Sequence, residues 1–339
     1  MRSPLPAVSA TAIGLILLSG CSDTSDTTNA DAASQEAPPA PAGSEATSPA
    51  PRETAAELPA GMVELGDSLP DDGETGGSWE IETSPLKPWK TTPKAREVPD
   101  GWKTAVLTLT LTNTSSEIKP LPTPTVTARY GPEGREAAQF TDTGLTDLDY
   151  RLGEESDPKN IGPHKTANMR VGIAVPSKAA GQSVTLSIGD SFAEGPFPGQ
   201  PAQPQIQTRP KASAKDLMKF DSWSSADRQP LRLAQPVVTP TQAGKVEVSL
   251  DVTFFNTEEA VNPVTRELGE AILRISYGDD LKETPDDPSI RLQNLAPSRA
   301  ATKTITFKLP KAAVPGPLII EVDSPFDGHV VTYEGEMSS

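Results

Sequence analysis

The same pattern of alternating apolar residues occurs twice in this chain of 339 residues. In residues 107–113, leucines alternate with threonines and the run ends at Asn113, which is typical of a strand with one buried face. Residues 250–256 repeat the spacing 143 positions later and end at Asn256, and a threonine follows the asparagine in both places. The repeat predicts that whatever the first half folds into, the second half folds into again.

A second block supports the duplication. Residues 163–192 align with residues 297–326 at a constant offset of 134 without a gap, so that Pro176 falls on Pro310. Any two β-rich segments share alternation, but that does not explain why proline, aromatic and Asn-Thr positions follow one order. The copies differ mainly in residues 132–162, an acidic segment 13 residues longer than its counterpart.

Short alternating runs, turn residues between them and the lack of a helical stripe predict an all-β fold. We expect two tandem, immunoglobulin-like antiparallel β-sandwich domains, at 61–195 and 212–336, with a proline-rich hinge at 196–211. Only one cysteine is present, so no disulfide joins the sheets.

The N-terminus has the features of an export signal. Arg2 precedes an apolar run at 7–18, which is too short to span a bilayer. The run ends in Leu18, Ser19, Gly20 and Cys21, which resembles the bacterial lipobox. We therefore expect residues 1–20 to be a lipoprotein signal peptide and Cys21 to carry the lipid. A buried core cysteine or an ordinary secretory signal is the alternative.

Residues 21–60 are rich in alanine, proline, serine and acidic residues and contain no aromatic residue, which predicts a disordered tether. Tether and lipid together place the folded part on the extracytoplasmic face of the cell membrane. The net charge of -16 argues against a nucleic-acid partner, because such binding relies on Lys and Arg neutralising phosphates.

The chain is similar to a group of actinobacterial surface lipoproteins of unknown function that carry immunoglobulin-like domains. The resemblance lies in glycine-led aliphatic strands that end in Asn and in apolar strands that end in Pro. These segments are Gly101 to Asn113, Gly162 to Pro176, Gly244 to Asn256 and Ala296 to Pro310. The resemblance implies β-sandwiches at the cell surface and supplies no catalytic residues.

Few residues indicate chemistry. The two histidines, His164 and His329, lack the spacing of a zinc site, and we interpret both as surface residues. Ser68 and Ser191 follow Gly-Asp as in a lipase/esterase signature, but that chemistry needs a strand-to-helix turn and a nearby histidine base. We expect no catalytic residue, metal or cofactor.

The acidic segment offers a weak calcium possibility through Asp142, Asp147 and Asp149, and a solvated loop is the favoured interpretation.

Aromatic residues give the only indication of binding. Trp102 precedes a strand in its polar phase, and Lys245 occupies the matching position of the second copy. We predict partner contacts by Trp102, Trp89 and Tyr150, although a cover over the open end of the sandwich is the favoured interpretation of Trp102.

The sequence therefore favours a non-enzymatic binding or adaptor module for a protein or cell-envelope component. A serine hydrolase acting on envelope substrates, and a structural spacer or envelope-stress sensor, remain alternatives.

Overall fold

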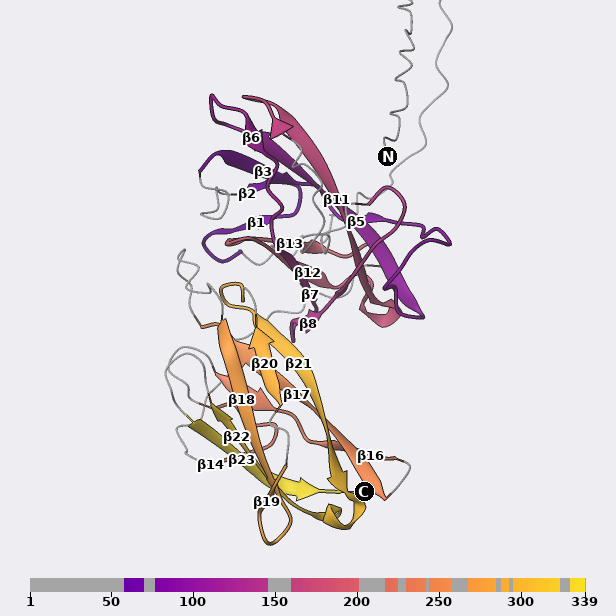
Figure 1. Cartoon of the computed structure of the whole chain (residues 1–339), viewed down its shortest axis with the longest axis vertical. Helices are drawn as coiled ribbons and strands as arrows, with labels where there is room; N and C mark the ends of the chain where they lie inside the picture. Colours follow the sequence, from indigo (N-terminus) through magenta and orange to yellow (C-terminus); the bar gives the residue numbers. More distant parts are fainter. Residues whose placement is uncertain are drawn as a thin grey trace, which may run out of the picture. The chain divides into compact units, whose positions relative to one another are not determined.

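Two hydrophobic cores organise the described part of the chain. The computed structural model describes residues 58–69, 77–145, 160–200, 217–224, 230–241, 244–257, 268–284, 288–292, 295–323 and 330–338. The first core draws its side chains from Leu69 to Phe197, and the second from Met218 to Met337. Figure 1 draws the first group of strands in indigo to magenta and the second in orange to yellow. The all-β expectation is confirmed, because strands dominate both groups and the described helical segments are short 3-10 turns.

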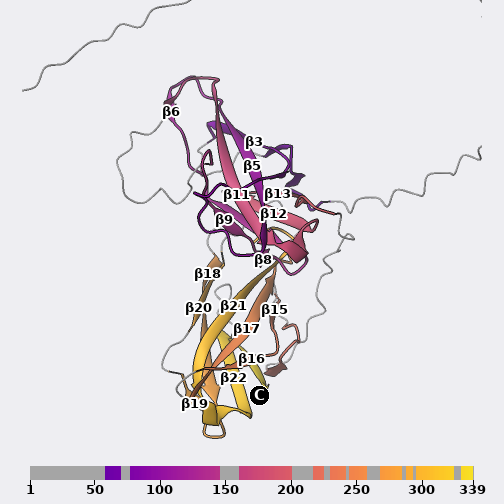
Figure 2. The same ribbon diagram turned by 90° about the vertical axis from the view of Figure 1, so that its right-hand side faces the viewer.

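The first sandwich packs two sheets around the first core. One sheet has the order β2-β3-β5-β11-β9 with β4 on β5, and the other begins β1-β13-β12-β7-β8. The long pair β5 and β11 is visible in Figure 2. The strands are β1 Met62–Glu64, β2 Ser68–Leu69, β3 Trp79–Thr83, β4 Lys87–Pro88, β5 Trp102–Asn113, β7 Val126–Tyr130, β8 Arg135–Glu136, β9 Ala138–Phe140, β11 Thr166–Pro176, β12 Ser183–Ile188 and β13 Ser191–Pro196. The short strands β6 Lys119–Pro120 and β10 Asn160–Ile161 pair with each other.

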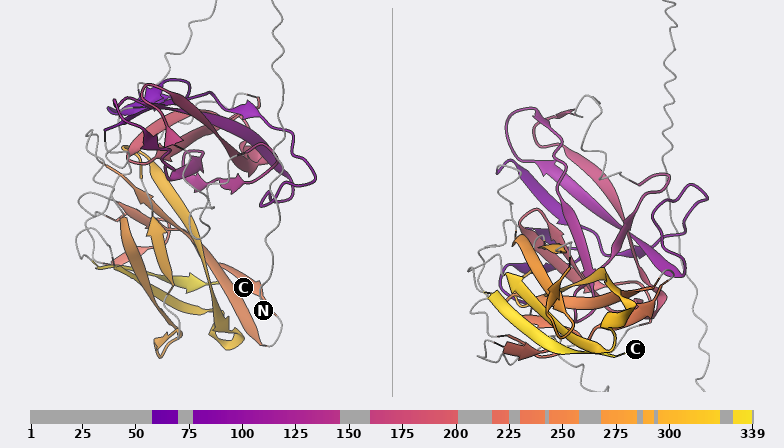
Figure 3. Two further views of the ribbon diagram at one scale, coloured as in Figure 1. Left: turned by 45° about the horizontal axis from the view of Figure 1, so that its top comes forward. Right: turned by 60° about the horizontal axis from the view of Figure 1, so that its bottom comes forward.

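The second sandwich repeats this plan. It packs β21-β17-β15, with β16 on β17, against β14-β23-β22-β18-β19, with β20 on β18 (Figure 3). The strands are β14 Leu217–Lys219, β15 Leu231–Leu233, β16 Val237–Pro240, β17 Lys245–Phe255, β18 Leu268–Tyr277, β19 Lys282–Glu283, β20 Ser289–Leu292, β21 Ala300–Pro310, β22 Gly316–Asp323 and β23 Val330–Met337.

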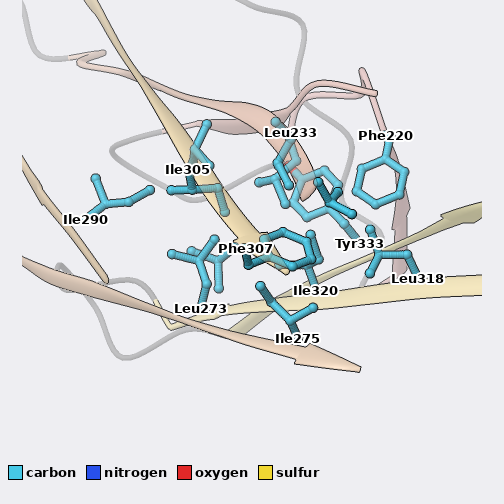
Figure 4. Close-up of a cluster of buried hydrophobic side chains, with 14 of the residues drawn as sticks. Phe220, Leu233, Leu273, Ile275, Ile290, Ile305, Phe307, Leu318, Ile320 and Tyr333 are labelled. Atoms are coloured by element: carbon cyan, nitrogen blue, oxygen red, sulfur yellow. The ribbon is translucent and has the colours of Figure 1, made fainter. Parts of the chain in front are cut away.

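Apolar side chains from both sheets converge between the layers of the second sandwich, among them Phe307, Leu273 and Tyr333 (Figure 4). Tyr333 is fully buried and donates its hydroxyl proton to the carbonyl oxygen of Leu231 at 2.5 Å. A hydrogen bond of this kind removes the cost of burying the phenol, so the ring can fill the centre of the core.

The leucine alternation reaches the core as the sequence predicts. Leu107, Leu109 and Leu111 are fully buried on one face of β5, and the threonines between them face outward. Strand β5 pairs with β11 over its whole length, from Trp102 opposite Pro176 to Thr112 opposite Thr166. The alternation therefore supplies one wall of the first core.

Both sandwiches use the same register and the same asparagine. Lys245 lies opposite Pro310 in β17 and β21, as Trp102 lies opposite Pro176. The side chain of Asn113 donates to the carbonyl oxygen of Ile161, and that of Asn256 to the carbonyl oxygen of Leu295, each at 3.0 Å. The sequence landmarks of the repeat therefore occupy matching structural positions.

The turn between β7 and β8, Gly131–Gly134, joins the two sandwiches. The backbone N–H of Thr302 in β21 donates to the carbonyl oxygen of Gly134 at 3.1 Å, so that β8 and β21 pair in parallel and one sheet contains strands of both sandwiches. Gly134 has a φ of 61°, and a Cβ there would lie 1.7 Å from the carbonyl oxygen of Ala300. Only glycine fits this contact.

The signal peptide, Cys21 with its lipobox and nearly all of the tether lie outside the described residues, as does most of the hinge. In the part that the structure describes, no helix has the length and apolar character needed to cross a membrane.

Candidate binding site

A hollow of about 580 Å³ opens at one end of the first sandwich. It lies where β7 ends and β8 begins, and where β11 ends in the 3-10 turn Ser177–Ala179 before β12. Its lining combines apolar, aromatic and charged side chains: Tyr130, Gly131, Pro132, Glu133, Arg135, Pro176, Lys178, Ala179 and Gln182. This volume is within the range of about 300–1,000 Å³ that ligand sites occupy.

Trp102 stands beside this hollow. It is the first residue of β5 and pairs with Pro176, a lining residue. Its ring meets that of Tyr130 edge to face, with centroids 6.5 Å apart and planes at 83°. Trp102 is half-buried, whereas Tyr130 is 9% exposed, so the tryptophan covers the tyrosine and still presents surface to solvent. This position is compatible with both interpretations of Trp102, as a cover for the end of the sandwich and as a contact residue for a partner.

Burial raises the pKa of Tyr130 above its usual value; the positive charge of Arg135 lowers it and the negative charge of Asp251 raises it further. The phenol therefore stays neutral at physiological pH and is available as a hydrogen-bonding group.

Glu133 and Arg135 form a charged wall of the hollow, and both side chains make ion pairs with residues of the second sandwich. Arg135 contacts Glu133 at 3.0 Å and Asp251 of β17 at 2.6 Å, and Glu133 also contacts Arg232 of β15 at 3.4 Å. The hydrogen bond to Asp251 is the main reason that the pKa of Arg135 is raised, despite the opposing effect of burial. The guanidinium group of Arg135 is thus held by carboxylates from both sandwiches.

The second sandwich lacks the distinctive residues of this hollow. At the positions of Trp102, Lys178 and Gln182 it has Lys245, Ala312 and Gly316. The tyrosine, by contrast, recurs as Tyr277, and Pro176 recurs as Pro310. The repeat therefore shares the framework of the hollow, whereas Trp102, Lys178 and Gln182 occur in the first copy alone.

Trp89 is not among the residues that line the hollow, and the partner contact expected of it stays a prediction. Its indole N–H donates to Asp142 at 2.9 Å, and the same carboxylate accepts the backbone N–H and the hydroxyl of Thr92. Partial desolvation raises the pKa of Asp142, but hydrogen bonds from Thr92, Trp89 and the Thr143 backbone outweigh it and hold that pKa well below its usual range.

The described residues contain no group of carboxylates, histidines and cysteines able to hold a metal ion. Asp147, Asp149 and Tyr150 lie outside the described residues, so the calcium possibility and the predicted contact at Tyr150 stay untested.

Ser68, Ser191 and His164 are not among the residues that line the hollow. Ser68 is an exposed residue of β2 whose hydroxyl contacts Glu82 at 3.4 Å, and Ser191 begins β13 after a two-residue hairpin turn. Neither position is a strand-to-helix turn. His164 is exposed in a turn at a φ of 54°, the conformation that Ser298 adopts in the second sandwich, and His329 lies outside the described residues.

Comparison of the chain with protein-family models and with curated proteins gives no match.

The sequence-based prediction names Trp102 but none of the residues that line the hollow beside it. Lys178 and Gln182 also differ between the copies, so the comparison of repeats that singles out Trp102 could have identified them as well. Arg135 and Glu133 carry no such signal, because Lys282 and Asp280 preserve their charges in the second copy.

Proposed function

We propose that the protein is a non-enzymatic binding or adaptor module and that the hollow beside Trp102 engages a protein partner or a cell-envelope component. One observation carries the proposal: Trp102, Lys178 and Gln182, which distinguish the first copy from the second, lie in or beside a single hollow.

The side chains of the hollow suit recognition. Trp102, which is half-buried, offers rigid aromatic surface, which loses little conformational freedom on binding and is enriched among residues that dominate binding energy. Lys178 is exposed and places an ammonium group at the edge, and Gln182 adds an amide. Apolar surface with a few polar groups is the usual composition of a ligand site.

Membrane attachment belongs to the same proposal. Acyl chains on Cys21, after cleavage behind Leu18, Ser19 and Gly20, would hold the sandwiches at the outer face of the cell membrane. Mass spectrometry of the membrane fraction is expected to find a diacylglyceryl group on an N-terminal Cys21. Membrane retention of an uncleaved Cys21→Ser protein would contradict attachment through this lipid.

Photo-crosslinking in cells tests the binding proposal. A photoreactive residue replaces Ser177 in the turn beside the hollow, and the control carries it at Lys311, the matching position of the second sandwich. Both positions are exposed. We expect a discrete adduct from position 177 and none from position 311. Equal labelling from both positions, or none from position 177, would contradict a site in the first sandwich.

A further inference from the structure

We infer that the second sandwich is part of the binding site, because it holds in place the charged wall that Glu133 and Arg135 give to the hollow. The inference rests on the proposed function for its biological meaning. It goes beyond that function by assigning Asp251 and Arg232, which lie outside the hollow, as positioning residues.

The wall belongs to a short hairpin. Glu133 lies in the turn between β7 and β8, and Arg135 is the first residue of β8, a strand of two residues. So short a strand has few hydrogen bonds of its own, since its ladder with β7 joins only Arg129 to Glu136 and Tyr130 to Arg135. The position of the wall therefore depends on what the hairpin packs against.

The second sandwich fixes the backbone of this hairpin. Thr302 donates its N–H to the carbonyl oxygen of Gly134 at 3.1 Å and its hydroxyl to that of Glu133 at 2.6 Å. Gly134 lies directly against the Ala300 backbone, with no room for a side chain between them. These contacts set both the direction and the depth of the turn.

Side chains from the second sandwich fix the wall itself. Asp251 contacts Arg135 at 2.6 Å and is oriented by the hydroxyl of Thr304, which donates to its other oxygen at 2.6 Å. Arg232 contacts Glu133 at 3.4 Å, and its guanidinium carbon lies 5.2 Å from the centroid of the Trp223 ring. Charge-assisted hydrogen bonds of this kind are stronger than neutral ones and restrict the side chains that form them.

A second set of contacts keeps the sandwiches together beside the wall. Arg299 donates two hydrogen bonds to Glu194, at 2.9 and 2.5 Å, and both side chains are 15% exposed. Met62 and Phe192 of the first sandwich form a buried cluster with Ala296 of the second. The hairpin is therefore held within a broader contact rather than by one ion pair.

The second copy shows the same hairpin without this docking residue. Leu281 occupies the position that matches Gly134, has a φ of 49° and is 51% exposed. A side chain at that place would collide with a backbone packed as closely as that of Ala300. The docking mode of the first hairpin therefore does not extend to the second.

Hydrogen exchange in the full chain tests the inference with Asp251→Asn, which removes a charge with little change in shape. The control is Glu321→Gln, which removes a carboxylate of the same sandwich that contacts Arg274 at 3.9 Å. We expect the amides of Gly131, Glu133, Gly134, Arg135 and Thr302 to exchange faster in Asp251→Asn by about tenfold or more, and to be unchanged in the control.

The pattern of exchange separates positioning from general destabilisation. A merely structural role for Asp251 would accelerate exchange across β17 and β21 alike, and unchanged exchange at residues 131–135 would also overturn the inference. Crosslinking from position 177 is read in the same variants and is expected to fall severalfold in Asp251→Asn alone. Unchanged crosslinking in Asp251→Asn would overturn the inference that the second sandwich positions the wall for binding. Absent crosslinking in the parent protein would overturn the proposed function instead. The exchange result would then decide the inference by itself.

Discussion

Asn113 shows how one buried polar side chain can stabilise a whole turn region. It is fully buried and donates to the carbonyl oxygens of Glu117, Ile161 and Gly162, at 2.8, 3.0 and 3.2 Å. Its own side-chain oxygen accepts the backbone N–H of Ser115 at 3.0 Å. The end of β5 thus satisfies backbone groups from two other segments, which explains why an asparagine closes the alternating strand in both copies.

Replacing Asn113 with alanine is expected to lower the free energy of unfolding by about 2–3 kcal/mol, because buried carbonyl groups lose their partners. Asn168→Ala is the matched control. Asn168 is exposed and accepts only the hydroxyl of Thr110 at 3.0 Å, so a change within about 0.5 kcal/mol is expected. Denaturant unfolding measures both, and equal losses would contradict the role assigned to Asn113.

Comparing alanine substitutions at Gly134 and Gly101 distinguishes the free energy lost with a close contact from that lost by a strained backbone conformation. Gly101 has a similar φ of 76°, but a Cβ there would meet nothing within 4 Å. Gly101→Ala is therefore expected to cost about 1–2 kcal/mol, the penalty of the left-handed conformation alone. Gly134→Ala is expected to cost more in the same unfolding measurement, since it also breaks the contact with Ala300. Equal losses in the two variants would show that the hairpin does not dock as described.

Among the elements, the link between the segment after β4 and the end of β9 has a predictable response to pH. Trp89 and Thr92 donate to Asp142, and these hydrogen bonds place the pKa of its carboxyl group below the usual range. A group whose pKa is lowered by folding stabilises the folded state above its unfolded pKa. That contribution is lost only when the pH falls through the lower, folded value.

We therefore expect the Trp89 indole N–H resonance to keep its position as the pH falls through about 4, where unperturbed aspartates titrate. Two-dimensional NMR at decreasing pH checks this, with Asp142→Asn identifying the resonance. A midpoint near pH 4 in the parent protein would mean that the carboxylate is not held as the structure shows.

The sequence predicts the strands themselves but not how distant strands and side chains pair. The leucines of β5 and the aliphatic residues of β11 predict strands, because alternation is a local property. The parallel pairing of β1 with β13 and the contact between Arg135 and Asp251 join residues far apart in the chain. No local pattern encodes them. The repeat supplies an internal comparison that singles out Trp102, whereas the hydrogen bond between Trp89 and Asp142, 53 positions apart, has no signal in the sequence.

At the scale of the whole molecule, the two sandwiches contribute different residues to the proposed site. The first carries the hollow described here and Trp102 beside it, and the second has Lys245 in place of Trp102 but supplies Asp251 and Arg232 to the wall. On the proposed function, duplication gives a scaffold twice, and divergence at some positions gives one of the two scaffolds a site. On this account the second sandwich is required for binding even though it contributes no surface to the hollow.

Trp102→Ala, followed by thermal melting and by crosslinking from position 177, tests the central claim most directly. Loss of the edge-to-face contact with Tyr130 is worth about 1 kcal/mol, which lowers the melting temperature by about 2–4 °C. Loss of a binding anchor costs about 2 kcal/mol or more, so the crosslinked fraction is expected to fall by more than about tenfold. Unchanged crosslinking together with a large fall in melting temperature would make Trp102 a packing residue and contradict a binding site at this hollow.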